Sequence, residues 1–267
     1  HLAGFSTQIN VTLNDDGTAT IKDNGRGIPI GIHPKAGIPA VEVVFTVLHA
    51  GGKFGDGGYK ISGGLHGVGA SVVNALSVWL EVEIRVDGGV YKQRYERGKA
   101  TAPLEKIGTY RKNDTGTTVT FLPDGEIFEK TRFKADAIKS RLHETAYLNP
   151  GLTIEFEDKR KGSEDKETFH EPDGLKAYIK DLNNGKETVC DIVYFKKKQE
   201  DIEVEVAFQF VNEFEENILG FCNNIYTQEG GTHITGFKTK FTMIINQYAR
   251  ELGILKDKDA NFTGLDV

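Results

Sequence analysis

The stretch from residue 49 to residue 71, H-A-G-G-K-F-G-D-G-G-Y-K-I-S-G-G-L-H-G-V-G-A-S, is the part of the chain best suited to chemistry. Glycine reaches positive φ freely and lets a backbone approach a ligand closely. The apolar residues that follow predict a helix from His66 to about Ser77, because they recur at helical spacing: Val68, Val72, Val73 and Leu76. Unpaired N–H groups at a helix start attract anions, and Lys53 and Lys60 add positive charge. The stretch therefore predicts a site for a nucleotide phosphate.

A glycine-rich loop that binds nothing is the structural alternative for this stretch. Two familiar phosphate-binding signatures are excluded. Lys53 is followed by Phe54 and not by Ser or Thr, so the P-loop pattern is absent. No G-x-G-x-x-G motif follows a predicted strand, so a Rossmann unit is absent too. A nucleotide bound here is held by another kind of fold.

A carboxylate stands at the end of the second predicted strand. Gln8–Leu13 and Thr18–Lys22 are predicted to form a hairpin, which D-N-G-R-G-I-P follows at residues 23–29. We expect Asp23 to accept a hydrogen bond from a donor such as an exocyclic amine, while the glycines let a ring lie against the backbone. The alternative is that D-N-G forms only a turn. Thr115, in the sequence D-T-G-T, is a further candidate polar contact or a simple turn residue.

Composition limits the class of protein. With 267 residues, 38% of them hydrophobic, the chain is long enough for one large or two ordinary globular domains. The formal net charge of −6 excludes a chain that clamps nucleic acid over its whole surface. The basic runs at residues 159–161 and 196–198 are interpreted as solvated loops. Cys190 and Cys222 form neither a disulfide framework nor a metal motif, and no apolar run spans a membrane, so we expect a cytoplasmic protein.

Both ends of the chain resemble cut edges. H-L-A-G at residues 1–4 is typical of a helix end with its glycine cap, and Met243 is the only methionine. Residues 261–267 enter a further element. We therefore expect a fragment of a longer protein.

The remaining pattern predicts strands and amphipathic helices. A helix is predicted with Pro39 as its first residue, and Glu42 is expected on its solvent side; its buried stripe is Ala40, Val43, Val44, Val47 and Leu48. Further strands are predicted at 79–86, 89–96, 118–122, 152–156, 202–211 and 218–226. Further helices are predicted at 133–145, 175–182 and 237–252.

The order of these elements predicts an α+β fold. A sheet with helices layered on one side is followed by a smaller unit of two strands and one long helix. The predicted domains are residues 1–186 and residues 187–267.

Four motifs in the same order resemble one family: D-N-G-R-G-I-P at 23–29, H-A-G-G-K-F at 49–54, G-G-L-H-G-V-G at 63–69 and E-G-G-T-H at 229–233. Together they resemble the B subunit of bacterial DNA gyrase, a type IIA topoisomerase of the GHKL ATPase superfamily. The resemblance implies a two-layer α/β sandwich of the GHKL type, followed by a partial transducer domain similar to ribosomal protein S5 domain 2. The similar B subunit of topoisomerase IV is the alternative; the form of the first motif favours gyrase.

The resemblance also implies roles for individual residues. Asp23 accepts the adenine amine with help from Thr115, and Lys53 and Tyr59 belong to a lid over the nucleotide. Backbone N–H groups from Leu65 to Gly69 hold the phosphates. The implied ATP-binding residues are Asp23, Gly27, Ile28, Pro29, Lys53, Tyr59, Leu65, His66, Gly67, Val68, Gly69 and Thr115.

Some of the family's machinery is expected outside this chain. The water-activating glutamate and the Mg²⁺ ligand are expected before His1, so no catalytic base is assigned within these residues. DNA, the gyrase A subunit and ATP-dependent self-dimerisation of the B subunit are the implied partners. Val86 stands where relatives often have an arginine used by aminocoumarin inhibitors, so weak aminocoumarin binding is expected.

Two other function classes stay open. The chain as it stands is also consistent with a nucleotide-binding module that does not hydrolyse ATP. An RNA-binding module is the third reading, suggested by the strand–strand–helix end. The acidic balance and the lack of interleaved aromatic and basic residues disfavour that reading.

Overall fold

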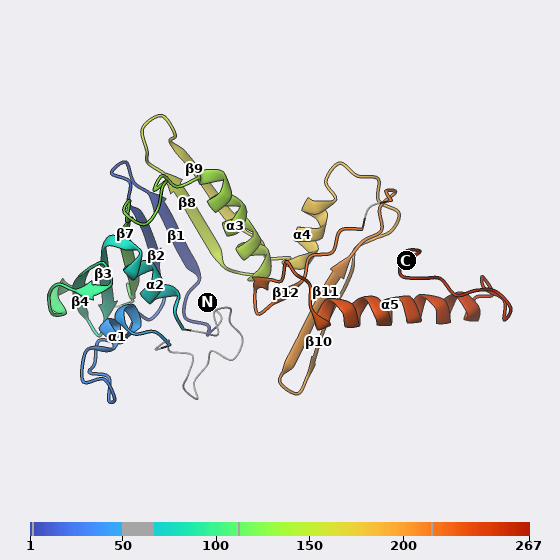
Figure 1. Cartoon of the computed structure of the whole chain (residues 1–267), viewed down its shortest axis with the longest axis horizontal. Coiled ribbons are helices and arrows are strands. Elements are labelled where there is room, and N and C mark those ends of the chain that lie inside the picture. The colour runs from blue at the N-terminus through green and yellow to red at the C-terminus, as the bar shows by residue number, and fades with distance from the viewer. Residues whose placement is uncertain (2, 50–66, 112, 215) are drawn as a thin grey trace. The chain divides into compact units, whose positions relative to one another are not determined.

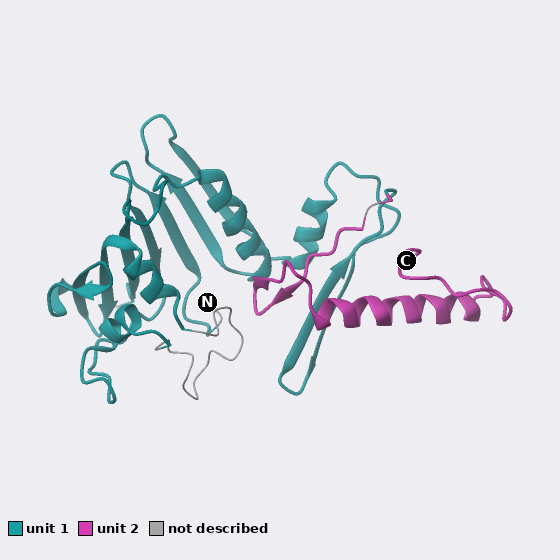
Figure 2. Cartoon of the chain, in the orientation of Figure 1, with its two compact units in different colours: residues 1–213 teal, residues 214–267 magenta. Residues whose placement is uncertain are grey.

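The structure is a computed structural model that describes residues 1, 3–49, 67–111, 113–214 and 216–267. Figure 2 shows its two compact units, His1–Glu213 (unit 1) and Phe214–Val267 (unit 2). The predicted boundary between two domains, at residues 186 and 187, falls inside unit 1. The division into units does not test this boundary, which stays a prediction.

Unit 1 is built on one large sheet (Figure 1). Its strands are β1 Gln8–Leu13, β2 Ala19–Asp23, β3 Ser77–Val86, β4 Gly89–Glu96, β5 Lys99–Ala100, β6 Glu105–Thr109, β7 Gly116–Pro123, β8 Thr153–Asp158 and β9 Asp165–His170. The order is β5-β4-β3-β7-β2-β1-β8-β9, with β6 also paired to β4. β1 and β8 run parallel, and the other pairs in the sheet are antiparallel.

The helices of this sheet cover one of its faces. They are α1 Ala40–Thr46, α2 Gly69–Ala75 and α3 Ala135–Leu148. Directly paired strand residues share a face, and the face with Leu80, Val82 and Ile84 packs against Val41 and Phe45 of α1. The same face continues to β1 and β8, where the partners come from α3 and the segment before it: Phe133, Ala135, Ile138, Leu142 and Ala146. This two-layer arrangement confirms the predicted α+β class.

The rest of the described chain contains smaller elements. Unit 1 continues with α4 Leu175–Leu182 and the antiparallel hairpin of β10 Val193–Gln199 and β11 Ile202–Phe208. Unit 2 contains a short hairpin, β12 Phe221–Cys222 and β13 Ile225–Tyr226, and the long helix α5 Thr232–Glu251.

Local sequence signals placed most of these elements correctly. The β1–β2 and β3–β4 hairpins form as predicted, around turns that contain Gly17 and Gly88 at φ of +85° and +73°. α3 ends at Leu148, before the predicted breaker N-P-G. α4 has its predicted bounds, and α5 includes the predicted apolar positions except Leu252, which is its C-cap.

The predicted faces of the first two helices were wrong in part. α1 ends at Thr46, so Val47 and Leu48 leave the helix and are exposed. α2 is shorter than predicted and buries its polar residues Ser71 and Asn74, while Val72 and Val73 are exposed. The register of α2 follows a tertiary hydrogen bond, which Asn74 Nδ2 donates to the Phe45 carbonyl at 2.9 Å. The spacing of apolar residues along the helix cannot predict this bond, because its partner lies 29 residues earlier in the sequence.

The basic run at residues 196–198 is also not a loop, since it lies in β10. Lys196 faces Glu205 across the hairpin and makes ion pairs with Glu203 and Glu205 at 2.8 and 3.7 Å. The predicted strand at 218–226 is the short β12–β13 hairpin instead, because Asn223 and Asn224 adopt positive φ. Two strands with many charged residues, β6 and β9, were not predicted.

Glu42 does not face solvent as expected. Its Oε2 accepts a hydrogen bond from Gln93 Nε2 at 2.8 Å, and the same amide nitrogen donates to the Ala102 carbonyl at 3.1 Å. Gln93 Oε1 accepts from the Tyr95 hydroxyl at 2.8 Å, and both side chains are fully buried. Burial, with the Glu42 charge as a second cause, raises the pKa of Tyr95. This network fixes α1 to β4.

Replacing Gln93 with Leu is expected to lower the free energy of unfolding by about 1–3 kcal/mol, because the partners lose their hydrogen bonds inside the core. Chemical denaturation of the variant measures this loss. The matched control is Gln93→Leu combined with Tyr95→Phe, which removes one stranded hydroxyl and is expected to recover part of the loss. Equal stability of wild type and Gln93→Leu would contradict the importance of the network.

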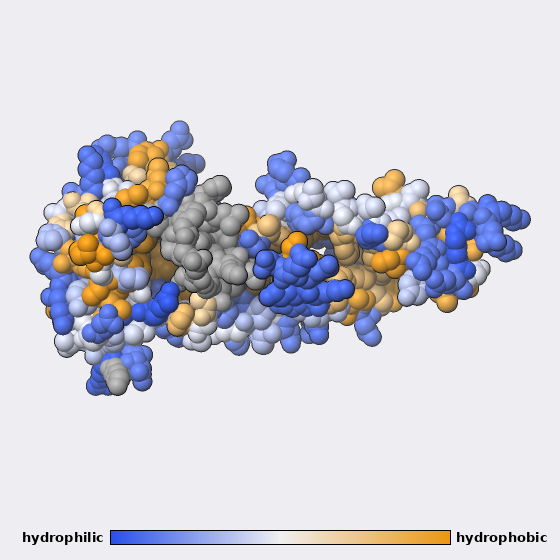
Figure 3. Space-filling model, turned by 90° about the horizontal axis from the view of Figure 1, so that it is seen from below, coloured by the Kyte–Doolittle hydropathy of each residue, from blue (hydrophilic) through white to orange (hydrophobic). Residues whose placement is uncertain are grey.

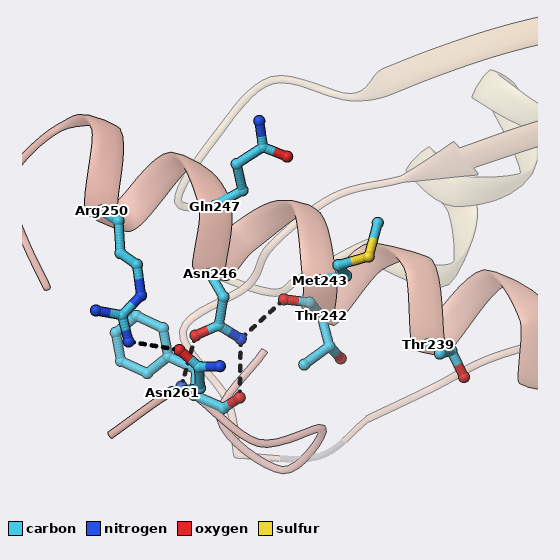
Figure 4. A pocket seen from close by; sticks show the side chains of 8 residues that line it. Thr239, Thr242, Met243, Asn246, Gln247, Arg250 and Asn261 are labelled. Atoms are coloured by element: carbon cyan, nitrogen blue, oxygen red, sulfur yellow. Dashed lines mark hydrogen bonds between the residues drawn. The ribbon is translucent and has the colours of Figure 1, made fainter. Parts of the chain in front are cut away.

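In unit 2, polar side chains of α5 hold the segment that follows it (Figure 4). Asn246 Nδ2 donates to the Phe262 carbonyl at 2.9 Å, and the Phe262 N–H donates to Asn246 Oδ1 at 2.7 Å. Arg250 donates to the carbonyls of Lys256 and Asp259 at 2.7 and 2.9 Å, and to Asn261 Oδ1 at 2.6 Å. These bonds join α5 to residues 256–262, beside the pocket drawn in the figure.

Hydrophilic and hydrophobic areas alternate on the surface (Figure 3). The β10–β11 hairpin exposes several apolar side chains on one face: Val193, Phe195, Ile202 and Val204. Among the described helices, none has both the length and the apolar character that crossing a membrane requires.

Candidate functional site

Asp23 ends β2 and begins a tight turn. Its Oδ1 accepts a hydrogen bond from the Gly25 N–H at 2.7 Å, which is the pattern of an Asx turn. Asn24 holds the neighbouring segment: its Oδ1 accepts from the N–H groups of Thr7 and Gln8, both at 2.9 Å. D-N-G therefore forms a turn, and this turn fixes Asp23 at the end of β2.

The start of β7 lies directly against Asp23. Lys22 pairs with Thr118, so one residue further along this register Asp23 lies beside Thr117. Gly116 has φ of +150°, and a Cβ at this position would overlap the carbonyl oxygen of Asp23. Glycine is required here because β7 and β2 approach so closely.

Register also decides which side chains share a face with Asp23. Thr117 pairs with Ile84 of β3 and is 6% exposed, so Asp23, Thr117 and Ile84 lie on the face that the helices cover. Thr115, predicted as the polar contact, is half-buried and lies just before the start of β7. Thr117 was missed, although alternation counted back from Val119 places its hydroxyl on this face.

Gly27 completes this end of the sheet. Its φ is +80°, and a Cβ would lie 2.9 Å from the Arg85 carbonyl oxygen and 3.2 Å from Val86 Cβ. The backbone after the turn therefore packs on the end of β3. Ile28 packs at the margin of the core, and Pro29 is exposed beside it. The structure thus brings together Asp23, Gly27, Ile28, Pro29, Thr115 and Thr117.

The glycine-rich stretch is described only from Gly67. Lys53, Tyr59, Leu65 and His66 lie outside the described residues. Gly67 has φ of +59°, Val68 is the N-cap of α2, and Gly69 is its first residue. Among the described residues no side chain caps this helix start, and the first N–H groups of a helix have no partner within the helix.

The described residues offer no metal site of their own. Within these ranges, no group of three or more His, Cys, Asp and Glu side chains is arranged to hold a metal ion. No step is therefore assigned to Mg²⁺ on these residues.

Asp23 lines neither of the two pockets described next, one in each unit. The one in unit 2, of about 460 Å³, is lined by α5 and the segment after it, with Met243, Asn246 and Arg250 among its residues. The one in unit 1, of about 220 Å³, lies between the end of α2, the end of β7 and residues 128–133. Its floor is mostly apolar: Val73, Leu76, Phe121, Pro123, Phe128 and Phe133.

Comparison with known families gives two matches along the chain. Residues 1–127 match the family described as histidine kinase-, DNA gyrase B-, and HSP90-like ATPase. Residues 174–267 match the family described as DNA gyrase B.

Relatives and solved structures agree with these matches. The chain is 52% identical to the B subunit of DNA topoisomerase 4 from Streptococcus pneumoniae and 51% identical to that from Enterococcus faecalis, over 99% of its length. The 43K ATPase domain of Thermus thermophilus gyrase B, solved with an aminocoumarin, matches at 40% identity and a TM-score of 0.82. This match covers 99% of the present chain and 68% of that domain. The topoisomerase IV ATP-binding domain of Francisella tularensis, solved with a small-molecule inhibitor, matches at 32% identity and a TM-score of 0.78, with 98% of this chain and 68% of that one covered.

The fold is that of the GHKL ATPases. The chain belongs to the B-subunit family of type IIA topoisomerases, as its four motifs predicted. It spans 41% and 38% of the lengths of the two curated relatives above.

Proposed function

We propose that this chain is the ATP-binding region of a type IIA topoisomerase B subunit. The observation that supports this most strongly is that Asp23, Thr117 and Gly27 lie together where the central strands β2, β7 and β3 end or begin. A carboxylate, a buried hydroxyl and an exposed backbone there match the donors and the flat ring of adenine.

Each group has a definite part in base recognition. Asp23 accepts a hydrogen bond from the exocyclic amine of adenine, since an ionised carboxylate only accepts. The Thr117 hydroxyl, together with Thr115, supplies a partner for a ring nitrogen, directly or through a water. Gly27, Ile28 and Pro29 form the wall against which the ring lies.

The phosphates are proposed to lie at the glycine-rich stretch. The start of α2 offers backbone N–H groups at Gly67, Val68 and Gly69, which favour negative charge. By resemblance, Leu65 and His66 extend this set, and Lys53 and Tyr59 close over the nucleotide.

Hydrolysis is proposed to need residues that precede this chain in the parent protein. The resemblance places the general base and the Mg²⁺ ligand on a preceding helix. An apolar pocket between α2 and β7 supports this proposal, because a preceding helix would cover it. Val73, Leu76 and Phe121 line this pocket.

Measuring phosphate release tests whether hydrolysis needs residues beyond those that bind ATP in this chain. The full-length protein is expected to hydrolyse ATP, while this chain is expected to bind a non-hydrolysable analogue without comparable turnover. Turnover by this chain at the full-length rate would place the base within these residues and overturn the proposal.

The parent protein is proposed to pass one DNA duplex through another. We place it in the cytoplasm, with an A subunit as its partner, and expect its B subunits to dimerise when ATP binds. The first motif favours gyrase. The relatives at 51–52% identity, described as B subunits of DNA topoisomerase 4, support topoisomerase IV instead. Assays of supercoiling and of decatenation with full-length B and A subunits separate the two enzymes, and absence of both activities would reject the class.

The predicted domains, residues 1–186 for ATP binding and residues 187–267 for the transducer, are part of this proposal.

Val86 is proposed to weaken aminocoumarin binding. Its side chain lies at the end of β3 against Gly27 and offers no hydrogen-bond donor. Val86→Arg is expected to raise aminocoumarin affinity by about tenfold, the effect of one charge-assisted hydrogen bond. Val86→Met controls for added bulk without charge. An unchanged inhibitor affinity in Val86→Arg would contradict the prediction.

A further inference from the structure

Arg85 is a buried arginine next to the proposed adenine site. The residue is 9% exposed, at the end of β3. Its Nε donates a hydrogen bond to the Asp114 carbonyl at 3.0 Å and lies 3.6 Å from Asp114 Oδ1. Its guanidinium is also 3.5 Å from Glu83 Oε1. A buried guanidinium is costly unless it is paired, so these contacts define a fixed position for the side chain.

The contact with Asp114 fixes the segment that enters β7. Asp114 precedes Thr115, and Gly116 pairs directly with Arg85 in the sheet. Gly116 therefore lies between its partner on β3 and the carbonyl of Asp23 at the end of β2. The Arg85 side chain adds a bond at Asp114, two residues before the strand begins, where no strand pairing restrains the chain.

Arg85 lies on the face of the sheet opposite to the proposed adenine site. Side chains alternate along β3, so Arg85 lies on the face opposite to Ile84 and Val86. Asp23 and Thr117 share the face with Ile84. Arg85 is therefore a positioning residue that holds the threonine segment without reaching the ligand.

We propose that Arg85 sets the base selectivity of the nucleotide site, an inference that rests on the function proposed above. Adenine presents an amine to the Asp23 carboxylate, whereas guanine presents a carbonyl oxygen that repels it. Discrimination of this kind requires the polar groups to be held in place, because a mobile segment adapts to either base. Loosening the Asp114 segment lowers selectivity more than it lowers overall affinity.

The test compares Arg85→Met with wild type. Affinities of non-hydrolysable ATP and GTP analogues are measured by calorimetry, with thermal unfolding as a check on folding. Arg85→Met is expected to lower the ratio of ATP to GTP affinity by about tenfold, and Arg85→Lys, which keeps a positively charged donor group, is expected to retain part of it. The matched control is Arg94→Met on β4, whose guanidinium lies over Trp79 and near Glu81 on the same side of the sheet. This control is expected to leave the ratio unchanged.

The outcomes separate this inference from the proposed function. An unchanged ratio in folded Arg85→Met, with normal wild-type binding, overturns the role of Arg85 alone. If Arg85→Met does not fold, an unchanged ratio in Arg85→Lys does the same. Failure of the wild-type chain to prefer ATP overturns the proposed adenine site and this inference with it.

Discussion

Gly116→Ala is expected to lower the free energy of unfolding by about 2–6 kcal/mol, since backbone strain and overpacking each cost roughly 1–3 kcal/mol. Gly116 has φ of +150°, which an L-residue rarely adopts, and its Cβ would overlap the Asp23 carbonyl oxygen. β7 has to move away from β2 to make room. The variant is therefore also expected to lose nucleotide binding, because Asp23 and Thr117 separate.

Denaturation followed by the fluorescence of Trp79, the single tryptophan, measures this loss. Gly88→Ala is the matched control: Gly88 has φ of +73° in the β3–β4 turn, but a Cβ there meets no atom within 4 Å. The control is expected to cost only about 1–2 kcal/mol, from backbone strain. A Gly116→Ala variant no less stable than Gly88→Ala would show that β2 and β7 are not in close contact.

Asp158→Asn is expected to cost about 3 kcal/mol, because it breaks a buried ion pair. The Asp158 side chain is 1% exposed, and both its oxygens accept from Arg160, at 2.8 and 2.6 Å. Arg160 also donates to the Phe133 carbonyl at 2.7 Å, which joins the end of β8 to the segment before α3. Losing the charge leaves the Arg160 guanidinium without its charged partner at this junction.

The same pair predicts a dependence on pH. The Arg160 guanidinium holds the pKa of Asp158 below its usual range. A carboxyl whose pKa is lower when folded stabilises the fold above its unfolded pKa of about 3.9, and this contribution is lost as pH falls below about 4. The gap in stability between wild type and Asp158→Asn is therefore expected to narrow below that pH.

Glu157→Gln is the neighbouring control, since its exposed pair with Lys159 at 3.3 Å is expected to contribute less than about 1 kcal/mol. Denaturation at several pH values compares the three proteins. A stability gap for Asp158→Asn that stays constant down to pH 3 would contradict the assigned ion pair.

The sequence predicted those parts of the fold whose signals are local. Alternation with Gly turns located the hairpins, and the breaker after Leu148 located the end of α3. The strand β10 was missed because Lys196 pairs with glutamates of β11, a partner that no local pattern reveals. The inward face of α2 was mispredicted because Asn74 bonds to Phe45, 29 residues away.

The candidate site was predictable to a similar extent. Asp23 and Gly27 stand in one motif, so their proximity follows from the sequence. That Thr117 lies beside Asp23 depends on the β2–β7 register, which pairs segments about 96 residues apart. The side chain of Arg85 holding Asp114 is likewise a tertiary feature that spacing does not encode.

The most direct measurement is calorimetric binding of a non-hydrolysable ATP analogue to this chain and to Asp23→Asn. Replacing the carboxylate, which only accepts, removes a charge-assisted hydrogen bond to the adenine amine. The expected loss is about 1.5–3 kcal/mol, or roughly ten- to a hundred-fold in affinity. Asp15→Asn, at the far end of the β1–β2 hairpin, controls for the change of charge and is expected to bind as wild type does. Equal affinity of wild type and Asp23→Asn would contradict the adenine site at the end of β2.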